Sequence, residues 1–451
     1  MKVFLQTFGC QMNKLDSALI VASLRGSGFD LVGSVNEADV VLFNTCSVRD
    51  HAEQRVLSHL GHLKHIKESR PELVVAVVGC MAQRLGSELF KQPAVDIVCG
   101  PAQIPDITRL INEAIQEKKK AIAVTEKIRQ APQDGQTLER FETEYGVEDG
   151  EIPGQAYVRA MHGCDKFCSY CVVPYVRGPE TSRPPAAIIE QTRRLAQNGI
   201  KQVTLLGQRI NAYEYKAGDK IYCLADLLGV ISDIDGIEWI RFVTSYPSPK
   251  FFAEIMQTMA KLPKVCRYLH LPAQSGSDKI LKTMNRGYTS AEYLELIDRA
   301  RQIVPDITVA GDFIVGFPGE NDDDFEQTVE LVKKAQYKNS FIFKYSPRPG
   351  TIADNRLEDN TPQEIKNQRN IELLKTQEKI SGELAQAFLG NTVKVLVEGP
   401  SKKSYLDNPQ LVGRTAGDWI VVFDGPSSLA GQFATVNITK TSPLTLFGKP
   451  V

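Results

Sequence analysis

The sequence predicts an α/β protein made of three parts: an N-terminal parallel α/β sheet domain, a central partial (βα)6 barrel and a small C-terminal antiparallel β-barrel. Three observations predict these parts. Apolar strands alternate with helices over residues 1–118, the same alternation repeats six times over residues 150–383, and the apolar period falls to two over residues 384–451. Residues 119–149 are polar and turn-rich, so we expect a linker there.

The first part is expected to form a parallel sheet covered on both faces, because its strands are continuous apolar runs. Strands are expected at residues 3–8, 39–44, 73–78 and 95–98, and helices at residues 16–25, 48–68 and 104–117. Cys10, Cys46 and Cys80, here called the strand-end triad, each follow one of the first three strands. The carboxyl ends of parallel strands share one edge, so the triad should converge into a three-thiolate site. The alternative is that these cysteines are small buried hydrophobes. Cys99 also ends a strand, but it lacks their polar setting and is assigned to the core.

The second part repeats the βα unit and carries a cysteine-rich loop. Strands are expected at residues 156–161, 202–206, 239–244, 267–271, 307–315 and 340–345, with helices at residues 187–196, 251–259, 290–303 and 324–334. In parallel barrels the functional groups gather at the carboxyl ends of the strands. Directly after the first strand, Cys164, Cys168 and Cys171 follow the pattern Cys-x-x-x-Cys-x-x-Cys; they are here called the loop triad.

A four-iron cubane takes four thiolates, one per iron, and the loop triad offers only three. One iron would therefore stay open to a ligand that is not protein. Two alternatives remain at this point: a zinc site with His162 as the fourth ligand, or unrelated buried thiols. Zinc sites mostly use paired Cys-x-x-Cys arms that are set well apart, which favours the cluster.

A helix is expected at residues 362–388, which Gly390 ends, and it leads into the last part. Strands follow at residues 393–397, 411–415, 419–423 and 434–438. Small barrels of this kind often bind single-stranded nucleic acid, and the alternative is a stabilising cap. The basic residues exceed the acidic ones by two: Lys394, Lys402, Lys403, Arg414, Lys440 and Lys449 against Glu398, Asp407, Asp418 and Asp424. Lys118, Lys119 and Lys120 form a further basic run, which is either solvated or touches a phosphate backbone.

Composition limits the remaining classes of protein. The formal net charge of -1 gives no global basic field, so a nucleic-acid surface would have to be local. The nine cysteines show no paired spacing, which indicates free thiols or metal thiolates in a reducing compartment. The N-terminus turns polar too early for a signal peptide, and no apolar run approaches the roughly 18 residues of a membrane span. We therefore expect a cytoplasmic protein without a membrane partner.

Six cysteines in two triads, with their flanking residues, carry a resemblance to a known family. The matching runs are residues 7–13, 44–49 and 79–84 around the strand-end triad and residues 163–178 around the loop triad. Over nearly its whole length the chain resembles the MiaB-type tRNA methylthiotransferases, which are radical S-adenosylmethionine (SAM) enzymes. In family terms, residues 1–118 resemble the methylthiotransferase N-terminal domain, residues 150–383 the radical SAM core, and residues 384–451 the RNA-binding TRAM domain.

The resemblance implies two 4Fe-4S clusters, through which both triads act. The cluster on the loop triad would bind and cleave SAM, and an auxiliary cluster on the strand-end triad would hold the sulfur to be inserted. The resemblance also implies SAM contacts at strand ends; these are Gly207, Gln208, His270, Gln274, Ser275, Ser277 and Gly316. Arg209 stands where relatives often carry asparagine, which leaves the local geometry open.

The implied activity adds a methylthio group to carbon 2 of isopentenyl-adenosine next to the tRNA anticodon. Radical chemistry is needed because that carbon bears an unactivated C–H bond. The implied partners are such a tRNA, a reductant such as flavodoxin or ferredoxin, and a sulfur donor system; a monomer is expected. Rival substrates are an aspartate of a small-subunit ribosomal protein and threonylcarbamoyl-adenosine in tRNA, but residues 10–13 and 171–175 look like the isopentenyl-adenosine branch. An iron–sulfur RNA-binding scaffold would leave the open iron and the SAM motifs unexplained.

Overall fold

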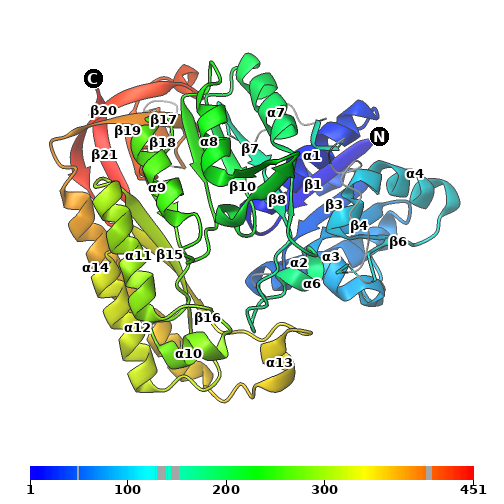
Figure 1. Ribbon diagram of the computed structural model, residues 1–451. Coiled ribbons are helices and arrows are strands. Elements are labelled where there is room, and N and C mark those ends of the chain that lie inside the picture. Colours follow the sequence, from blue (N-terminus) through cyan, green and yellow to red (C-terminus); the bar gives the residue numbers. More distant parts are fainter. Residues whose placement is uncertain (48–49, 127, 130–138, 140, 144–151, 403–408) are drawn as a thin grey trace. The chain divides into compact units, whose positions relative to one another are not determined.

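The computed structural model of the chain describes residues 1–47, 50–126, 128–129, 139, 141–143, 152–402 and 409–451 (Figure 1). The chain divides into two compact units. Unit 1 comprises the described residues of Met1–Glu151 together with Met161–Phe167 and Cys171–Arg183, and unit 2 comprises Ile152–Ala160, Cys168–Tyr170 and Pro184–Val451. The loop triad is therefore divided, since Cys164 and Cys171 belong to unit 1 and Cys168 belongs to unit 2.

Unit 1 contains the predicted parallel sheet. Its strands are β1 (Lys2–Thr7), β2 (Asp30–Leu31), β3 (Val40–Thr45), β4 (Val74–Gly79), β5 (Ile97–Cys99) and β6 (Ala121–Ala123), in the order β2-β1-β3-β4-β5-β6. Every pair is parallel. Strand β6 lies in the segment expected to be a linker, and it was missed because its three residues are too short to show a pattern. The helices are α1 (Gln11–Gly26), α2 (Asp50–Ser69), α3 (Cys80–Leu85) and α4 (Ile107–Glu117), with 3-10 turns at Val35–Glu37, Gly86–Lys91 and Pro101–Asp106.

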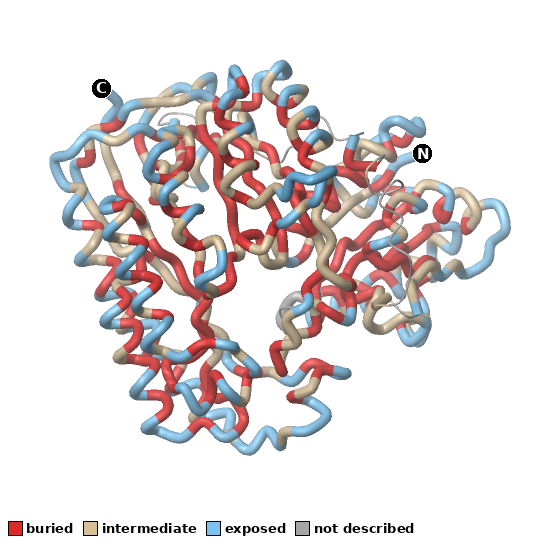
Figure 2. The backbone as a smooth tube through the Cα atoms, viewed as in Figure 1, coloured by how far each residue is buried: buried red, intermediate tan, exposed pale blue. Residues whose placement is uncertain are grey.

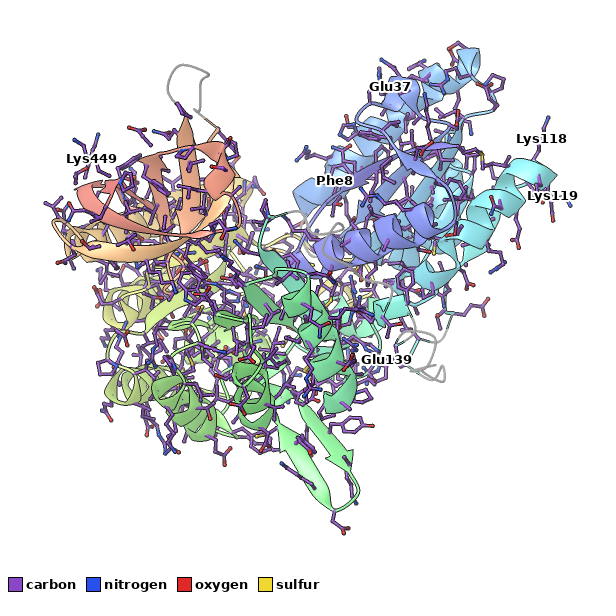
Figure 3. The ribbon with its side chains drawn as sticks, turned by 90° about the horizontal axis from the view of Figure 1, so that it is seen from above. Phe8, Glu37, Lys118, Lys119, Glu139 and Lys449 are labelled. Carbon is purple, nitrogen blue, oxygen red and sulfur yellow. The ribbon has the colours of Figure 1, made fainter. Side chains whose placement is uncertain are left out.

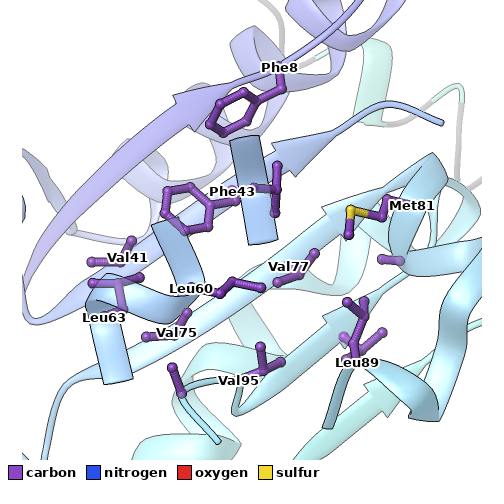
Figure 4. Close-up of a cluster of buried hydrophobic side chains, with 14 of the residues drawn as sticks. Phe8, Val41, Phe43, Leu60, Leu63, Val75, Val77, Met81, Leu89 and Val95 are labelled. Atoms are coloured by element: carbon purple, nitrogen blue, oxygen red, sulfur yellow. The ribbon is translucent and has the colours of Figure 1, made fainter. Parts of the chain in front are cut away.

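The core of unit 1 explains why its central strands are apolar throughout. Val41 and Phe43 of β3 pack with Leu60 and Leu63 of α2 in one buried cluster (Figure 4). Successive side chains of a strand point to opposite faces, so Val40 and the residues in phase with it face the other side of the sheet, where α1 packs on β3 and α4 on β4. Both faces are covered, and β3 and β4 are buried along their whole length (Figure 2).

Helix α1 begins five residues earlier than the sequence pattern predicts, at Gln11 rather than Asp16. Its first turn is polar, so apolar spacing does not reveal it. Asn13 in that turn is nevertheless buried, and its side-chain amide donates to the Thr45 carbonyl oxygen at 2.8 Å. A buried amide of this kind is stable only with its hydrogen bonds made.

Unit 2 contains six parallel strands in two sheets of three. Strands β7 (Gln155–Arg159), β10 (Gln202–Leu206) and β13 (Trp239–Phe242) form one sheet, and β14 (Tyr268–His270), β15 (Thr308–Val315) and β16 (Asn339–Lys344) form the other. A single parallel bridge between Ile240 and Val265 links the two. This arrangement confirms the predicted partial barrel.

Helices surround this barrel in chain order. They are α7 (Pro185–Gln197), α8 (Leu224–Ser232), α9 (Phe252–Lys261), α11 (Ser290–Ile303), α12 (Asp322–Ala335) and α14 (Gln363–Gln386), and each packs on the next (Figure 1). Several short elements were not predicted: α6 (Val173–Val176), α10 (Asp278–Thr283), α13 (Ile352–Arg356), the pair β8 (Met161–His162) and β9 (Thr181–Ser182), and the hairpin β11 (Glu214–Ala217) and β12 (Lys220–Cys223).

The C-terminal strands close into a barrel, as predicted. They are β17 (Thr392–Pro400), β18 (Gln410–Arg414), β19 (Ile420–Asp424), β20 (Phe433–Thr441) and β21 (Thr445–Pro450), in the order β17-β18-β19-β21-β20, with a 3-10 turn at Ser427–Leu429. Strand β21 was missed because it contains glycine and proline, which are weak strand formers. The barrel is also not wholly antiparallel, since β19 and β21 pair in parallel.

The C-terminal barrel is joined to the strands of the partial barrel by buried polar contacts inside unit 2. Arg241 of β13 donates to the carbonyl oxygens of Thr415 and Ala416. The Asp418 carboxylate lies 3.1 Å from Lys338 Nζ, 3.2 Å from Arg414 Nη1 and 3.7 Å from Arg241 Nη1. Three cations thus share one acid at this junction. In the described part of the chain no helix is both long and apolar enough to cross a membrane.

Candidate functional site

The strand-end triad lies at the carboxyl edge of the sheet in unit 1. Strands β1, β3 and β4 are neighbours; Cys46 and Cys80 directly follow β3 and β4, and Cys10 caps α1 just after β1. Gly9 lets the turn after β1 approach Cys46. Gly9 has φ +116°, and a Cβ there would stand 2.2 Å from Cys46 Cβ. A side chain would collide with Cys46, so the turn requires glycine.

One arginine donates a hydrogen bond to the sulfur of Cys80. Arg177 Nε donates to Cys80 Sγ at 3.3 Å, and its Nη2 donates to Asp16 Oδ2 at 2.7 Å and to Asn13 Oδ1 at 3.1 Å. The Cys10 thiol lies 3.4 Å from the same Asn13 oxygen. The side chains of Arg177 and Asp16 are only 5% and 2% exposed, so this is a fully buried ion pair beside the triad.

The surroundings shift the pKa values of Cys10 and Cys80 in opposite directions. A hydrogen bond from Cys46 and the charge of Arg177 lower the pKa of Cys10 to about 6, although burial opposes the shift. Burial raises the pKa of Cys80, and the charge of Arg177 opposes that rise. A lowered pKa increases the share of the thiolate at neutral pH.

The loop triad is held through its backbone and one sulfur. In unit 1, the Cys164 amide donates to the Gly178 carbonyl oxygen at 3.0 Å, and Arg129 donates to the Cys164 carbonyl oxygen at 3.1 Å. In unit 2, Cys168 is 7% exposed, and its neighbour Ser169 donates from its amide to the Met284 carbonyl oxygen at 2.9 Å.

A second arginine reaches the sulfur of Cys168. Arg286 Nη1 donates to Cys168 Sγ at 3.3 Å, its Nη2 to the Pro272 carbonyl oxygen at 3.0 Å, and its Nε to the Tyr288 hydroxyl at 2.8 Å. The guanidinium also lies 4.4 Å from the centre of the Tyr246 ring. Among the described residues the charges that act on Arg286 come from tyrosines and from Cys168 rather than from a carboxylate. Each triad thus has one sulfur that accepts a hydrogen bond from an arginine.

Two unpartnered polar atoms mark the carboxyl ends of neighbouring strands in unit 2. Gln208 Oε1, two residues after β10, and Ser245 Oγ, three residues after β13, are buried and have no hydrogen-bond partner among the described residues. Buried polar atoms normally have partners, so these two fit a polar ligand at this edge. The sequence analysis singled out Gly207 and Gln208 but missed Ser245, which its position after a predicted strand could have revealed.

The predicted contacts after β14 have local partners. His270 Nε2 lies 3.2 Å from Asp312 Oδ1, and Gln274, at φ +74°, pairs through its backbone with β15. The Ser277 hydroxyl donates to Asp324 at 2.7 Å and caps α10, and the Ser275 hydroxyl accepts from the Ser277 amide at 3.2 Å. The two hydroxyls therefore build this turn, and their contact with SAM stays a prediction.

Gly316 and Arg209 complete the predicted set. Gly316 follows β15 with φ +68°, and a Cβ there would stand 2.4 Å from Lys366 Cγ, so packing alone requires glycine. Its amide donates to Glu320 Oε1 at 2.8 Å. The Arg209 guanidinium lies 5.8 Å from the centre of the Tyr246 ring, which Arg286 also contacts. The effect of Arg209 on SAM contacts stays a prediction.

Among the described residues no group of three His, Cys, Asp or Glu side chains is placed to hold a metal ion, so the ligand roles of both triads stay predictions. None of the nine cysteines forms a disulfide, and Cys99 is buried in β5 with its thiol 3.5 Å from the Gly100 carbonyl oxygen.

Three family profiles and several named relatives match the chain. The family profile "Radical SAM superfamily" matches residues 158–332, "Uncharacterized protein family UPF0004" residues 2–100 and "TRAM domain" residues 386–451. A tRNA-2-methylthio-N(6)-dimethylallyladenosine synthase of Rhodopirellula baltica is 45% identical over 455 residues, which cover 99% of this chain and 95% of that protein. The protein of the same name from Aquifex aeolicus is 41% identical over 450 residues, which cover 99% of this chain and 98% of that one.

A solved structure shares the fold at low identity. The radical S-adenosylmethionine methyltransferase TsrM from Kitasatospora setae, with cobalamin and a 4Fe-4S cluster bound, matches with a TM-score of 0.52 at 15% identity. The match covers 78% of this chain and 77% of that chain. At this identity the likeness concerns the fold alone.

Proposed function

Because this chain belongs to the family of tRNA-2-methylthio-N(6)-dimethylallyladenosine synthases, we propose that it adds a methylthio group to carbon 2 of isopentenyl-adenosine, also called dimethylallyladenosine, beside the tRNA anticodon. The chain is a radical SAM enzyme of the transferase class. The observation that carries the proposal is the match to this family over 99% of the chain, which includes the strand-end triad and the hydrogen bond from Arg177 to Cys80.

The proposal gives each group of residues a task. The loop triad holds the cluster that binds SAM, and the strand-end triad holds the auxiliary cluster. When bound, these groups supply a carbon radical and a sulfur atom. Gln208 and Ser245 bind polar atoms of SAM, which is supported by their buried and unpartnered oxygens. The same edge of the partial barrel in unit 2 is shaped by Gly207, His270, Gln274 and Gly316. Ser275 and Ser277 hold the turn between β14 and α10.

The C-terminal barrel is proposed to bind the tRNA through phosphate contacts. Two of its predicted cations are already engaged, since Lys394 lies 2.8 Å from Glu238 and Arg414 3.0 Å from Glu398. Lys440 and Lys449 remain on the exposed face of the barrel, and Figure 3 shows Lys449 at its outer side. Lys403 and Asp407 lie outside the described residues. In unit 1, Lys119 lies 3.5 Å from Glu117 at the end of α4, which leaves that run a smaller role.

Further partners belong to the proposal as well. A reductant such as flavodoxin or ferredoxin supplies the electron that cleaves SAM, and a sulfur donor system renews the auxiliary cluster. The protein acts as a monomer in the cytoplasm, where thiolate ligands stay reduced. The relatives bear the name of the dimethylallyladenosine synthase, which favours this substrate over the ribosomal aspartate and over threonylcarbamoyl-adenosine.

An anaerobic assay tests the activity directly. The reconstituted protein is incubated with SAM, a reductant and tRNA that either carries or lacks the isopentenyl group, and the nucleosides are analysed by mass spectrometry. We expect the methylthio product only from the isopentenylated tRNA. C168A should abolish both the product and 5′-deoxyadenosine, because the cluster loses a ligand that the chain cannot replace. Product from plain tRNA, or SAM cleavage by C168A at the wild-type rate, would contradict the proposal.

The role of the barrel is tested by charge reversal. K440E/K449E should weaken tRNA binding and reduce the slope of log K against log salt by about 2, because two phosphate contacts are lost. SAM cleavage without tRNA should stay unchanged. K333E, on the exposed side of α12, is the matched control and should leave tRNA affinity as it is. Equal affinity in the barrel variant and the control would leave the barrel a structural part only.

A further inference from the structure

The segment that follows the loop triad sends one side chain into the strand-end triad. Arg177 lies directly after α6 and six residues after Cys171, and all of these belong to unit 1. We propose that Arg177 is a positioning residue for the auxiliary cluster: it holds the sulfur of Cys80 and supplies a positive charge that favours the reduced state of that cluster. The inference rests on the proposed function, since it needs a cluster on the strand-end triad.

Packing fixes the aim of this arginine independently of the sulfur. Val172 and Val176 pack with Cys80 in a small buried cluster, and the Arg177 amide donates to the Val173 carbonyl oxygen at 2.8 Å. The backbone of Arg177 is therefore anchored beside Cys80 before any hydrogen bond to the sulfur forms. A guanidinium has five donors in a rigid fork, so one edge can bind an acid while another faces a sulfur.

The second anchor is the acid on α1. Arg177 Nη2 donates to Asp16 and Asn13, and Arg177 Nε donates to Cys80 Sγ at 3.3 Å. The pair of Arg177 and Asp16 is neutral as a whole. The Arg177 guanidinium, however, donates directly to the Cys80 sulfur, whereas Asp16 contacts a different edge of that guanidinium. Coulomb interactions weaken with distance, so the field at Cys80 is net positive. This unequal placement distinguishes a tuning role from a simple ion pair.

The consequence concerns the redox balance of the site. A cluster gains one negative charge when it is reduced, and a fixed cation beside a ligand sulfur stabilises the more negative state. Arg177 should therefore raise the reduction potential of the auxiliary cluster, and Asp16 should lower it. The two residues of one ion pair are thus expected to act with opposite sign.

The test uses the full chain with C164A/C168A/C171A, in which only the strand-end triad can hold a cluster. After anaerobic reconstitution, iron and sulfide are counted and the potential is measured by titration monitored with electron paramagnetic resonance. In this background R177Q should lower the ratio of reduced to oxidised cluster at least tenfold at the midpoint potential of the parent, which corresponds to a shift of about 59 mV. R177K keeps the charge and should shift the ratio less.

D16N should change the potential in the direction opposite to R177Q. It leaves the guanidinium beside the sulfur but removes the acid, so the ratio of reduced to oxidised cluster should rise. R177Q/D16N removes both partners, leaves no unpaired buried carboxylate, and should fall between the single variants. K67Q is the matched control, because it breaks the ion pair of Lys67 with Asp96 at the other end of the strands and touches no cysteine. Its potential should equal that of the parent.

The outcomes separate this inference from the proposed function. If the background protein holds no iron, the auxiliary cluster itself is wrong and the proposed function fails with it. If the cluster forms but R177Q and D16N move the potential in the same direction, or leave it where K67Q does, Arg177 is only a structural ion pair and the inference is overturned. Should R177Q fail to fold, D16N and R177K still decide, since D16N must raise the potential above that of the parent.

Discussion

Replacing Arg286 by methionine should destabilise the protein more when the cluster is present than when it is absent. Arg286 donates to Cys168 Sγ at 3.3 Å, and among the described residues the charges that act on it come from tyrosines and from Cys168 rather than from a carboxylate. Binding to iron fixes a negative charge on a ligating sulfur. The cluster therefore provides the counter-charge that the chain itself does not.

The magnitude follows from the contacts that are lost. R286M removes the hydrogen bonds to Pro272 and Tyr288 and the contact with the Tyr246 ring in both forms of the protein, so these losses cancel in the comparison. What remains is the hydrogen bond to a charged sulfur, worth about 2 kcal/mol. At roughly 2–4 °C per kcal/mol for a domain of this size, the melting temperature should fall about 4–8 °C more with the cluster than without it.

The assay is anaerobic thermal unfolding of the reconstituted and of the chelator-treated protein. R301M is the matched control, because Arg301 donates to the carbonyl oxygens of Ala335 and Gln336 and contacts no cysteine. Its melting temperature should fall by the same amount in both forms. If R286M also shifts both forms equally, the cluster does not serve as the counter-charge of Arg286, and the reasoning is refuted.

Three further predictions follow from buried polar groups. S245A should weaken SAM binding about tenfold in equilibrium dialysis, as one hydrogen bond to a polar ligand is lost, without changing the melting temperature of the SAM-free protein. D418N should cost about 3–5 kcal/mol and open the junction of barrel and core to hydrogen exchange, because Lys338 and two arginines lose their shared acid. Burial raises the pKa of Glu320 to about 7 from its ordinary 4.5, so the folded protein keeps this proton where the unfolded chain has released it. The contribution of Glu320 to the free energy of unfolding is complete below pH 4.5. That contribution, about 3 kcal/mol, is lost as the pH rises through 7. E320Q should lack that fall when unfolding is followed from pH 5 to 8, and an identical pH profile in both proteins would contradict the assignment.

Local patterns in the sequence were enough to predict the sheets and the places of the cysteines. Cys46 and Cys80 directly follow buried apolar strands, and strand ends in a parallel sheet meet by geometry. That the three strand ends are neighbours could therefore be predicted without knowledge of distant contacts. The ligand roles of both triads stay predictions that the iron counts will test.

The arginines of the two triads could not be found in this way. Arg177 lies 97 residues from Cys80 and Arg286 lies 118 residues from Cys168 along the chain. No periodicity or motif spacing links positions so far apart, and only the folded chain shows which cation reaches which sulfur. Short or glycine-containing strands such as β6 and β21 escaped for a different reason, since their pairing is decided by the neighbouring strands rather than by their own residues.

The tight junction between barrel and core sets the reach of the enzyme. Gly154, just before β7, and Gly431 of the barrel approach so closely that a Cβ on Gly154 would stand 2.7 Å from the Gly431 carbonyl oxygen. Together with Asp418 and its three cations, this contact joins the C-terminal barrel closely to the strands of unit 2. If the C-terminal barrel binds the tRNA as proposed, the tRNA would be held at a set distance from the strand ends. The position of the modified base would then be selected by distance along the RNA as well as by the chemistry of the base itself.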